Sequence, residues 1–290
     1  MNTTLRKNLI FVSGKGGVGK TAVSQALALA LSEEGKRTLW VAFEDPTRPP
    51  GELVQKSRTL WHLNCDAGQA FEEYAALKIG MAALTRIFLK NKLVRYLAKA
   101  APGIHELVLL GKVWHERENY DHVVIDMPST GYGLAMFQST QNFANLFKTG
   151  PLYRDSADML ISFQDPRHTA ILIVALPEEM PLRESLELKD FLQDLFPENP
   201  PLFWVNRKFP RLTTPLEEEQ NPPDSWKEPF AKTLSDYATK RSILESHNLR
   251  LWSENGIHFE ELGLIPFSSA QTLDAVVKAL TEQIEEKGLV

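Results

Sequence analysis

The sequence is poor in cysteine, since Cys65 is the single thiol in 290 residues. One thiol cannot form an intrachain disulfide, a thiolate zinc cage or a cysteine-ligated iron–sulfur cluster. The seven histidines show neither an H-x-x-x-H nor an H-E-x-x-H spacing, so no zinc is expected. Because a chain without disulfides suits a reducing compartment, we expect a cytoplasmic protein.

The sequence also lacks an excess of basic residues and a long hydrophobic run. Its 32 Lys and Arg are outnumbered by 37 Asp and Glu, which gives a net charge of −5. A nucleic-acid-binding protein usually has a basic face, so we expect no nucleic-acid partner. The apolar run at 9–12 is short, and the uncharged stretch 127–147 contains Ser, Thr, Gln and Asn throughout. We therefore expect neither a signal peptide nor stable insertion into a membrane.

Short apolar runs alternate with longer helical segments, and this pattern predicts an α/β fold: a mostly parallel sheet with helices on both faces. The expected strands are residues 9–12, 38–43, 122–125, 171–175, 202–205 and 259–264, with a weaker candidate at 59–64. Two helical blocks, at approximately 66–118 and 132–168, interrupt this pattern. We interpret them as a helical subdomain inserted into a single domain that spans 1–290. The Pro- and Glu-rich stretch 210–230 predicts an exposed loop.

A phosphate-binding loop follows the first expected strand. Its residues satisfy the pattern G-x-x-x-x-G-K-[ST] and are Gly14, Lys15, Gly16, Gly17, Val18, Gly19, Lys20 and Thr21. Glycines let backbone N–H groups surround phosphates, and the start of the next helix adds a positive dipole end. Lys20 can neutralise charge on the β- and γ-phosphates, and the Thr21 hydroxyl can ligate Mg²⁺. The expected ligands are ATP and Mg²⁺; the alternative is a glycine-rich turn that binds nothing.

Two aspartates follow expected strands. Asp126 ends the run 122–125, where a carboxylate beside the phosphate loop suits Mg²⁺ or its water shell; the alternative is an N-cap for the next helix. Asp45 follows the run 38–43 and precedes Pro46. A carboxylate there can orient an attacking water, although taken alone the motif is better explained as an ordinary Asp-Pro turn.

Lys15 is a second lysine early in the loop, which marks the deviant Walker A motif of the SIMIBI class of ATPases. In that class this lysine typically reaches the partner subunit's nucleotide. With Asp45-Pro46 and the segment DMPSTG at 126–131, the loop resembles the ArsA family. That family includes arsenite-pump ATPases and the ATPases that target tail-anchored membrane proteins. Similar segments at 67–74, 176–179 and 205–207 extend the resemblance over nearly the whole chain.

The resemblance implies roles for individual residues. Asp45 resembles the switch I acid that positions the hydrolytic water. Residues 126–131 resemble switch II, with Asp126 near Mg²⁺ through water and the Gly131 region sensing the γ-phosphate. Asn206 resembles the residue that reads adenine, and Pro266 lies in a loop expected to flank the base.

Three departures from the family pattern limit what the resemblance implies. The chain lacks the several cysteines of arsenite-pump members, the C-x-x-C zinc pair of eukaryotic targeting members and a second phosphate loop. The sequence therefore predicts a Mg²⁺-dependent ATPase that acts as a homodimer, or as a heterodimer with a related ATPase, on an unidentified client. The alternatives are a partition or cell-division-site ATPase acting on DNA or membrane, and a nucleotide-bound adaptor without hydrolysis.

Methionine and phenylalanine gather in the helical blocks and their flanks. The residues are Met81, Met127, Met136, Met159, Met180, Phe137, Phe143, Phe147 and Phe163. One interpretation is a flexible surface on the helical subdomain for an apolar client. The other, which we favour, is the core of a helical subdomain, because apolar stripes on helices are usually core.

Overall fold

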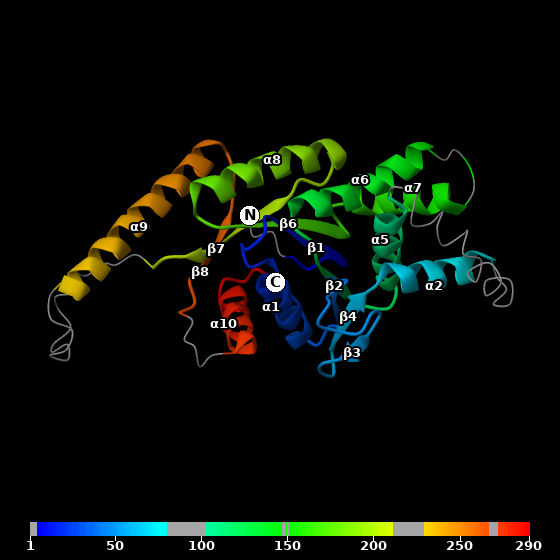
Figure 1. Ribbon diagram of the computed structural model, residues 1–290, viewed down its shortest axis with the longest axis horizontal. Helices are drawn as coiled ribbons and strands as arrows, with labels where there is room; N and C mark the ends of the chain where they lie inside the picture. The colour runs from blue at the N-terminus through cyan, green and yellow to red at the C-terminus, as the bar shows by residue number, and fades with distance from the viewer. Residues whose placement is uncertain (1–4, 80–102, 147–148, 150, 211–228, 267–271) are drawn as a thin grey trace.

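The computed structural model describes residues 5–79, 103–146, 149, 151–210, 229–266 and 272–290, and its centre is one eight-stranded sheet (Figure 1). The strand order is β3-β4-β2-β5-β1-β6-β7-β8. The strands are β1 (Leu9–Ser13), β2 (Thr38–Phe43), β3 (Leu53–Gln55), β4 (Leu60–Cys65), β5 (His122–Asp126), β6 (Thr169–Ala175), β7 (Leu202–Lys208) and β8 (Glu260–Gly263). All neighbouring strands pair in parallel except β3 and β4, which are antiparallel.

Helices cover both faces of this sheet, so the predicted fold class is confirmed. The described helices are α1 (Lys20–Glu33), α2 (Ala67–Ile79), α5 (Ile104–Glu116), α6 (Thr130–Leu146), α7 (Pro151–Gln164), α8 (Glu179–Leu195), α9 (Pro229–Glu254) and α10 (Leu273–Glu286). Helices α1 and α10 lie on one side of the sheet, and α5 to α8 lie on the other (Figure 1). Each side has its own cluster of buried apolar side chains.

Burial on both faces explains why the central strands are continuous apolar runs. Every residue of β1 and of β6 is buried, so neither strand needs a polar face. All the expected strands are present, and the weaker candidate at 59–64 is β4. The strand missed by the sequence analysis is β3, which has three partly exposed residues at the edge of the sheet and is too short to show a pattern.

The helical blocks contain α2 and α5 in the first and α6 and α7 in the second. These four helices contact one another, and α5 and α7 also touch strands of the sheet. The division into a domain and a subdomain stays a prediction. The loop expected at 210–230 lies largely outside the described residues. Among the described helices, none combines the length and the apolar character needed to cross a bilayer.

The methionines and phenylalanines of these blocks are mostly core, as the second interpretation predicted. The buried side chains are Met127, Met136, Met159, Phe137, Phe143 and Phe163. Met180 is 58% exposed, and Met81 and Phe147 lie outside the described residues. The buried residues join the helices to the sheet and are not available as a client surface.

His62 is a buried polar residue on the α1 side of the sheet. Its ring stacks on Trp40, with centroids 4.3 Å apart and planes 25° from parallel, because β2 and β4 pair these two positions. Neither ring nitrogen of His62 has a hydrogen-bond partner among the described residues. Burial, followed by the nearby charges of Arg48 and Lys56, lowers the pKa of His62 from 6.5 to about 4. The imidazole is therefore neutral in the folded protein at physiological pH.

This burial predicts an acid-sensitive fold. Between pH 6.5 and 4 the unfolded chain protonates His62 and the folded chain does not, so stability falls as the pH falls through this window. The loss should be about 2–3 kcal/mol by pH 4. We expect His62→Phe, which keeps a ring against Trp40, to remove that part of the pH dependence. Urea unfolding of both proteins between pH 4 and 8 measures it, and parallel pH profiles would contradict the prediction.

Candidate nucleotide-binding site

The loop between β1 and α1 is held tightly at both ends, and only glycine fits at the two anchor points. At Gly14 φ is +142°, and a Cβ would lie 2.3 Å from the carbonyl oxygen of Val174 in β6. At Gly19 φ is +93°, and a Cβ would lie 2.5 Å from Nδ2 of Asn206 in β7. The loop is therefore fixed against the neighbouring strands by its backbone.

The tip of the same loop is open. A Cβ built at Gly16 or Gly17 would meet no heavy atom within 4 Å, and both glycines are exposed. Helix α1 begins directly after the loop at Lys20, with Gly19 in the N-cap position. The unsatisfied N–H groups of a helix start and its positive dipole end favour an anion at this place. The local geometry thus fits the phosphates predicted from the motif.

Lys20 points back into the loop. Its Nζ donates a hydrogen bond to the carbonyl oxygen of Lys15 at 2.8 Å, and the side chain is mostly buried. Burial lowers the pKa of Lys20, and the negative charge of Asp126 opposes that effect. The ammonium group lies within the loop, where the motif requires a cation.

Asp126 and Thr21 meet because β5 pairs with β1. Val12 is the register partner of Asp126, which brings the end of β5 beside the start of the loop. The Thr21 hydroxyl donates to Oδ2 of Asp126 at 2.6 Å. The other oxygen, Oδ1, is buried and has no partner among the described residues, and burial raises the pKa of Asp126 to about 6. A hydroxyl beside an under-coordinated carboxylate is an oxygen donor set that fits Mg²⁺.

Lys15 forms an ion pair with Glu184 of α8 across the mouth of the loop. Oε2 of Glu184 is buried, and no partner for it is present in the described part of the chain. The sequence analysis missed Glu184, because nothing in the local pattern of α8 distinguishes it from the other acidic residues of that helix. Lys15 is therefore held by an acidic residue of its own chain, and its role toward a nucleotide stays a prediction.

Asp45 contacts its own loop. Its Oδ1 accepts hydrogen bonds from the backbone N–H of Thr47 at 2.9 Å and from the Thr47 hydroxyl at 2.6 Å, while its Oδ2 lies 3.6 Å from Nε of Arg48. The hydrogen bonds from Thr47 are the main reason that the pKa of Asp45 is lowered. Asp45 is thus an ionised carboxylate turned onto the loop, and its role toward water stays a prediction.

Asn64, at the end of β4, holds this loop and was also missed. Its Oδ1 accepts from the N–H of Asp45, and its Nδ2 donates to the carbonyl oxygens of Asp45, Arg48 and Pro49. The side chain is buried. A buried amide at the carboxyl end of a strand was the available signal, and the weak strand pattern at 59–64 concealed it.

Asn206 braces the phosphate loop from β7. Its Nδ2 donates to the carbonyl oxygen of Val18 at 2.9 Å, and its Oδ1 accepts from the N–H of Arg207 at 2.9 Å. Both ends of the amide are therefore in use, and reading adenine would require them to exchange partners. Gly131 and Pro266 are exposed, in α6 and after β8. Their contacts with a nucleotide stay predictions.

Two non-glycine residues have a left-handed backbone, and each is next to a predicted site residue. Glu44 has φ of 50° and precedes Asp45, and Arg207 has φ of 58° and follows Asn206. Such conformations are uncommon outside glycine and cluster at functional sites. The turns beside Asp45 and Asn206 thus have strained backbone conformations, which sequence patterns do not reveal.

Comparison with known proteins decides the family. The family model of the anion-transporting ATPase, ArsA, matches residues 7–152, which is half of the chain and includes the whole phosphate loop and Asp126. The chain belongs to the ArsA family. The prediction of an ATPase is thereby confirmed at the level of this family.

Named relatives come from bacteria and from a eukaryote. "Putative ATPase Mb3704" of Mycobacterium bovis is 28% identical over 232 residues, which cover 72% of this chain and 67% of the relative. "Putative arsenical pump-driving ATPase 2" of Aquifex aeolicus is 31% identical over 155 residues, covering 48% and 52%. "ATPase ASNA1 homolog" of Plasmodium berghei is 26% identical over 242 residues, covering 68% and 61%. The three names are those of an ATPase, an arsenical pump-driving ATPase and an ASNA1 homolog.

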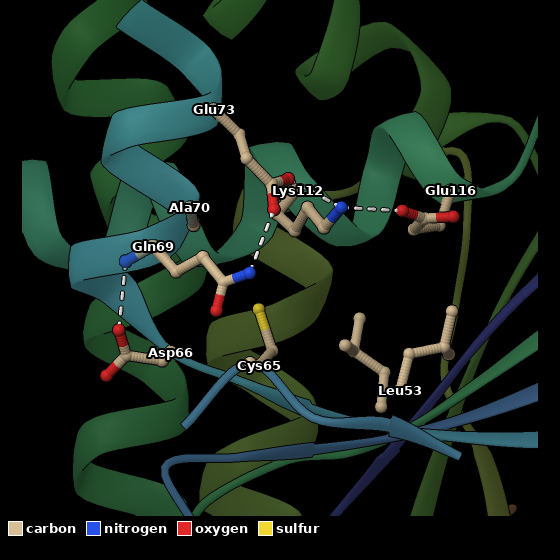
Figure 2. A pocket seen from close by; sticks show the side chains of 10 residues that line it. Leu53, Cys65, Asp66, Gln69, Ala70, Glu73, Lys112 and Glu116 are labelled. Atoms are coloured by element: carbon tan, nitrogen blue, oxygen red, sulfur yellow. Dashed lines mark hydrogen bonds and ion pairs between the residues drawn. The ribbon is translucent and has the colours of Figure 1, made fainter. Parts of the chain in front are cut away.

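The single thiol of this ArsA-family chain is buried. Cys65 lines a pocket of about 240 Å³ between β4, α2 and α5, where Gln69 and Lys112 also contribute (Figure 2). Lys112 is paired with Glu73 at 2.6 Å and with Glu116 at 2.7 Å. Burial raises the pKa of the Cys65 thiol to about 12. The thiolate that binds a soft metalloid is therefore scarce at neutral pH.

We expect ATP hydrolysis to be insensitive to arsenite and antimonite, because one buried thiol cannot supply three thiolates within a chain. Folded protein should also react with iodoacetamide at pH 8 at least about a hundredfold more slowly than the urea-unfolded chain. Phosphate release with and without each metalloid, and mass spectrometry of alkylation, measure the two effects. Activation by either metalloid that disappears in Cys65→Ala would contradict the prediction.

Proposed function

We propose that this chain is a Mg²⁺-dependent ATP hydrolase whose nucleotide cycle opens and closes a dimer. The observation that carries the proposal is the contact between Thr21 and Asp126 beside the buried ammonium of Lys20, at the start of α1 where the glycine loop ends. Membership of the ArsA family supports the same activity. The dimer and its client go beyond the family assignment.

Each part of the loop has a distinct role toward ATP. The backbone N–H groups at the loop tip and the start of α1 bind the phosphate oxygens, and Lys20 balances their charge. Thr21 and Asp126 hold Mg²⁺, with Asp126 acting through water. When bound, Mg²⁺ neutralises charge at the β- and γ-phosphates.

Asp45 and Asn206 act after a change of partners. The Asp45 carboxylate must break its hydrogen bonds with Thr47 and its ion pair with Arg48 before it can orient the attacking water. Hydrolysis therefore requires the loop after β2 to rearrange. The side-chain amide of Asn206 gives up its hydrogen bonds to Val18 and Arg207 and binds instead to the donor and acceptor groups on the edge of adenine. Both residues therefore couple nucleotide binding to movement of the loops.

Lys15 provides the link between the two chains. Lys20 already supplies the positive charge that the phosphates need within the loop. The second lysine, Lys15, therefore contacts the nucleotide bound by the partner chain, as an arginine finger does. In the single chain Lys15 is paired with Glu184. Closure of the dimer would move Lys15 from Glu184 to the β- and γ-phosphates of the nucleotide bound by the partner. The ion pair between Lys15 and Glu184 therefore keeps the rate of ATP hydrolysis by the isolated chain low.

Phosphate release by the purified protein tests the activity. We expect Mg²⁺-dependent ATP hydrolysis by the wild type, loss of nucleotide binding or turnover in Lys20→Ala, and turnover lowered at least about tenfold in Asp45→Asn. Lys36→Ala is the matched control, since Lys36 is an exposed lysine outside the loop. Unchanged ATP affinity and turnover in Lys20→Ala would show that the site assignment is wrong.

A pair of variants tests the role of Lys15. We expect Lys15→Ala to bind ATP nearly normally but to hydrolyse it at least about a hundredfold more slowly, a loss of about 2.7 kcal/mol in transition-state stabilisation. Glu184→Gln frees Lys15, so this variant should dimerise and turn over at lower protein concentration. Glu187→Gln, an exposed residue of the same helix, is its control.

Turnover and sedimentation in ATP and Mg²⁺ are measured over a range of protein concentrations. Turnover by Lys15→Ala at the wild-type rate would contradict the transfer of Lys15 between chains. The same transfer would be contradicted if the wild type hydrolysed ATP at the same rate per chain at concentrations where sedimentation finds only monomers as at concentrations where it finds dimers.

A further inference from the structure

Strand β7 contains a bulge directly beside the phosphate loop. The register between β7 and β8 shifts between Val205 and Lys208. Two residues of β7, Asn206 and Arg207, therefore oppose a single residue of β8. Bulges re-aim side chains and are over-represented next to active sites. This bulge leaves the Asn206 side chain buried and presents Arg207 to solvent.

Buried contacts with α9 hold the far end of the bulge. The backbone N–H of Phe209 donates to Oε2 of Glu245 at 2.8 Å, and Nζ of Lys208 lies 3.5 Å from the same oxygen. Glu245 is 2% exposed, and its Oε1 accepts a hydrogen bond from Nε of Arg241 at 2.8 Å. Because the carboxylate is buried among these donors, the chain that leaves the bulge is fixed in place.

Arg207 itself has a strained backbone conformation within the bulge. Its φ of 58° lies in the left-handed region, where the Cβ of any residue except glycine is crowded by the backbone. Glycine adopts the same φ without this penalty. Strained residues of this kind cluster at functional sites. The backbone alone would favour glycine here, so the presence of an arginine calls for a role of its side chain.

The Arg207 guanidinium lies beside the end of the phosphate loop. A Cβ built at Gly19 would lie 3.7 Å from Nη2 of Arg207. The guanidinium has no ion pair or hydrogen bond within the described part of the chain. Gly19 directly precedes Lys20, the first residue of α1. The protein thus holds an unpaired cation next to the place where the loop and the helix start favour an anion.

We infer that Arg207 binds a phosphate oxygen of the nucleotide in its own chain. A guanidinium presents a planar fork of N–H donors that matches the oxygens of a phosphate. Lys20 reaches the phosphates from within the loop, whereas Arg207 approaches from the side of β7. The inference rests on the proposed function, because it requires a nucleotide at the phosphate loop.

Calorimetric titration with ADP and with adenosine, in the presence of Mg²⁺, tests the inference without any hydrolysis. We expect Arg207→Gln to bind ADP at least about tenfold more weakly than the wild type, since it removes a charged hydrogen bond. Adenosine has no phosphate and should bind both proteins alike. Arg207→Lys restores the charge without the fork of donors and should recover part of the affinity for ADP.

Arg58→Gln is the matched control for the loss of charge. Arg58 is exposed and lies between β3 and β4, at the edge of the sheet opposite to β7 and β8. The variant changes the net charge by the same amount as Arg207→Gln. We expect it to bind ADP as tightly as the wild type.

Arg207→Gly separates a binding role from a structural one. Because glycine adopts a positive φ without steric penalty, the nucleotide-free variant should melt at or above the temperature of the wild type. Its affinity for ADP should nevertheless fall as far as that of Arg207→Gln. A residue that only supported the fold would not lose binding while stability was kept or raised. Thermal unfolding without nucleotide provides the comparison.

The outcomes distinguish this inference from the proposed function. A wild type that does not bind ADP would overturn both. If the wild type binds ADP, the role of Arg207 is overturned by equal affinity in Arg207→Gln, or by an equal loss in Arg58→Gln. It is also overturned if adenosine binding weakens by the same factor as ADP binding, because the side chain would then contact the base or the ribose.

Discussion

The pairing of β5 with β1 is the constraint on which the site depends. It places Asp126 opposite Val12, and the N–H of Met127 donates to the carbonyl oxygen of Val12 at 3.0 Å. Only this register brings the carboxylate within hydrogen-bond distance of the Thr21 hydroxyl, 105 residues away in the chain. A slip of one residue would turn Asp126 to the other face of the sheet. The buried apolar runs of both strands, which fix the register, therefore also fix the contact between Asp126 and Thr21.

The burial that fixes the position of Asp126 also makes its negative charge energetically costly. Desolvation raises its pKa to about 6, against the opposing effects of the Thr21 hydroxyl and Lys20. The folded protein thus buries a carboxylate with one oxygen that has no partner among the described residues. An apolar side chain at this position would cost less free energy to bury. A nearby cation and its water shell would offset this cost, which is the physical argument for Mg²⁺ beside Asp126.

The sequence predicts the parts of the site that depend on local spacing. The phosphate loop, Lys20, Thr21 and Asp126 follow from a motif between a strand and a helix, and the strands follow from apolar runs. Glu184 could not be predicted, because its contact with Lys15 joins residues 169 positions apart and depends on how α8 packs. Asn64 was not predicted because the weak strand pattern at 59–64 concealed its place at the end of β4, and the left-handed turns at Glu44 and Arg207 leave no periodic pattern in the sequence.

The loop after β2 is where the remaining features of the molecule converge. Asn64 fixes its backbone, Thr47 and Arg48 hold the Asp45 carboxylate, and Glu44 enters it with a strained φ of 50°. Backbone hydrogen bonds also tie this loop to β4, from the N–H of Glu44 to the carbonyl oxygen of Cys65 and from the N–H of Gly51 to the carbonyl oxygen of Asn64. The contacts that can be exchanged for contacts to a nucleotide at small cost are therefore those of the Asp45 side chain. Arg48, which pairs with Asp45, also lines a pocket beside His62. The phosphate loop is braced by the close approaches at Gly14 and Gly19, whereas the Asp45 carboxylate is held by side-chain contacts, so the loop after β2 is the more adaptable part of the candidate site.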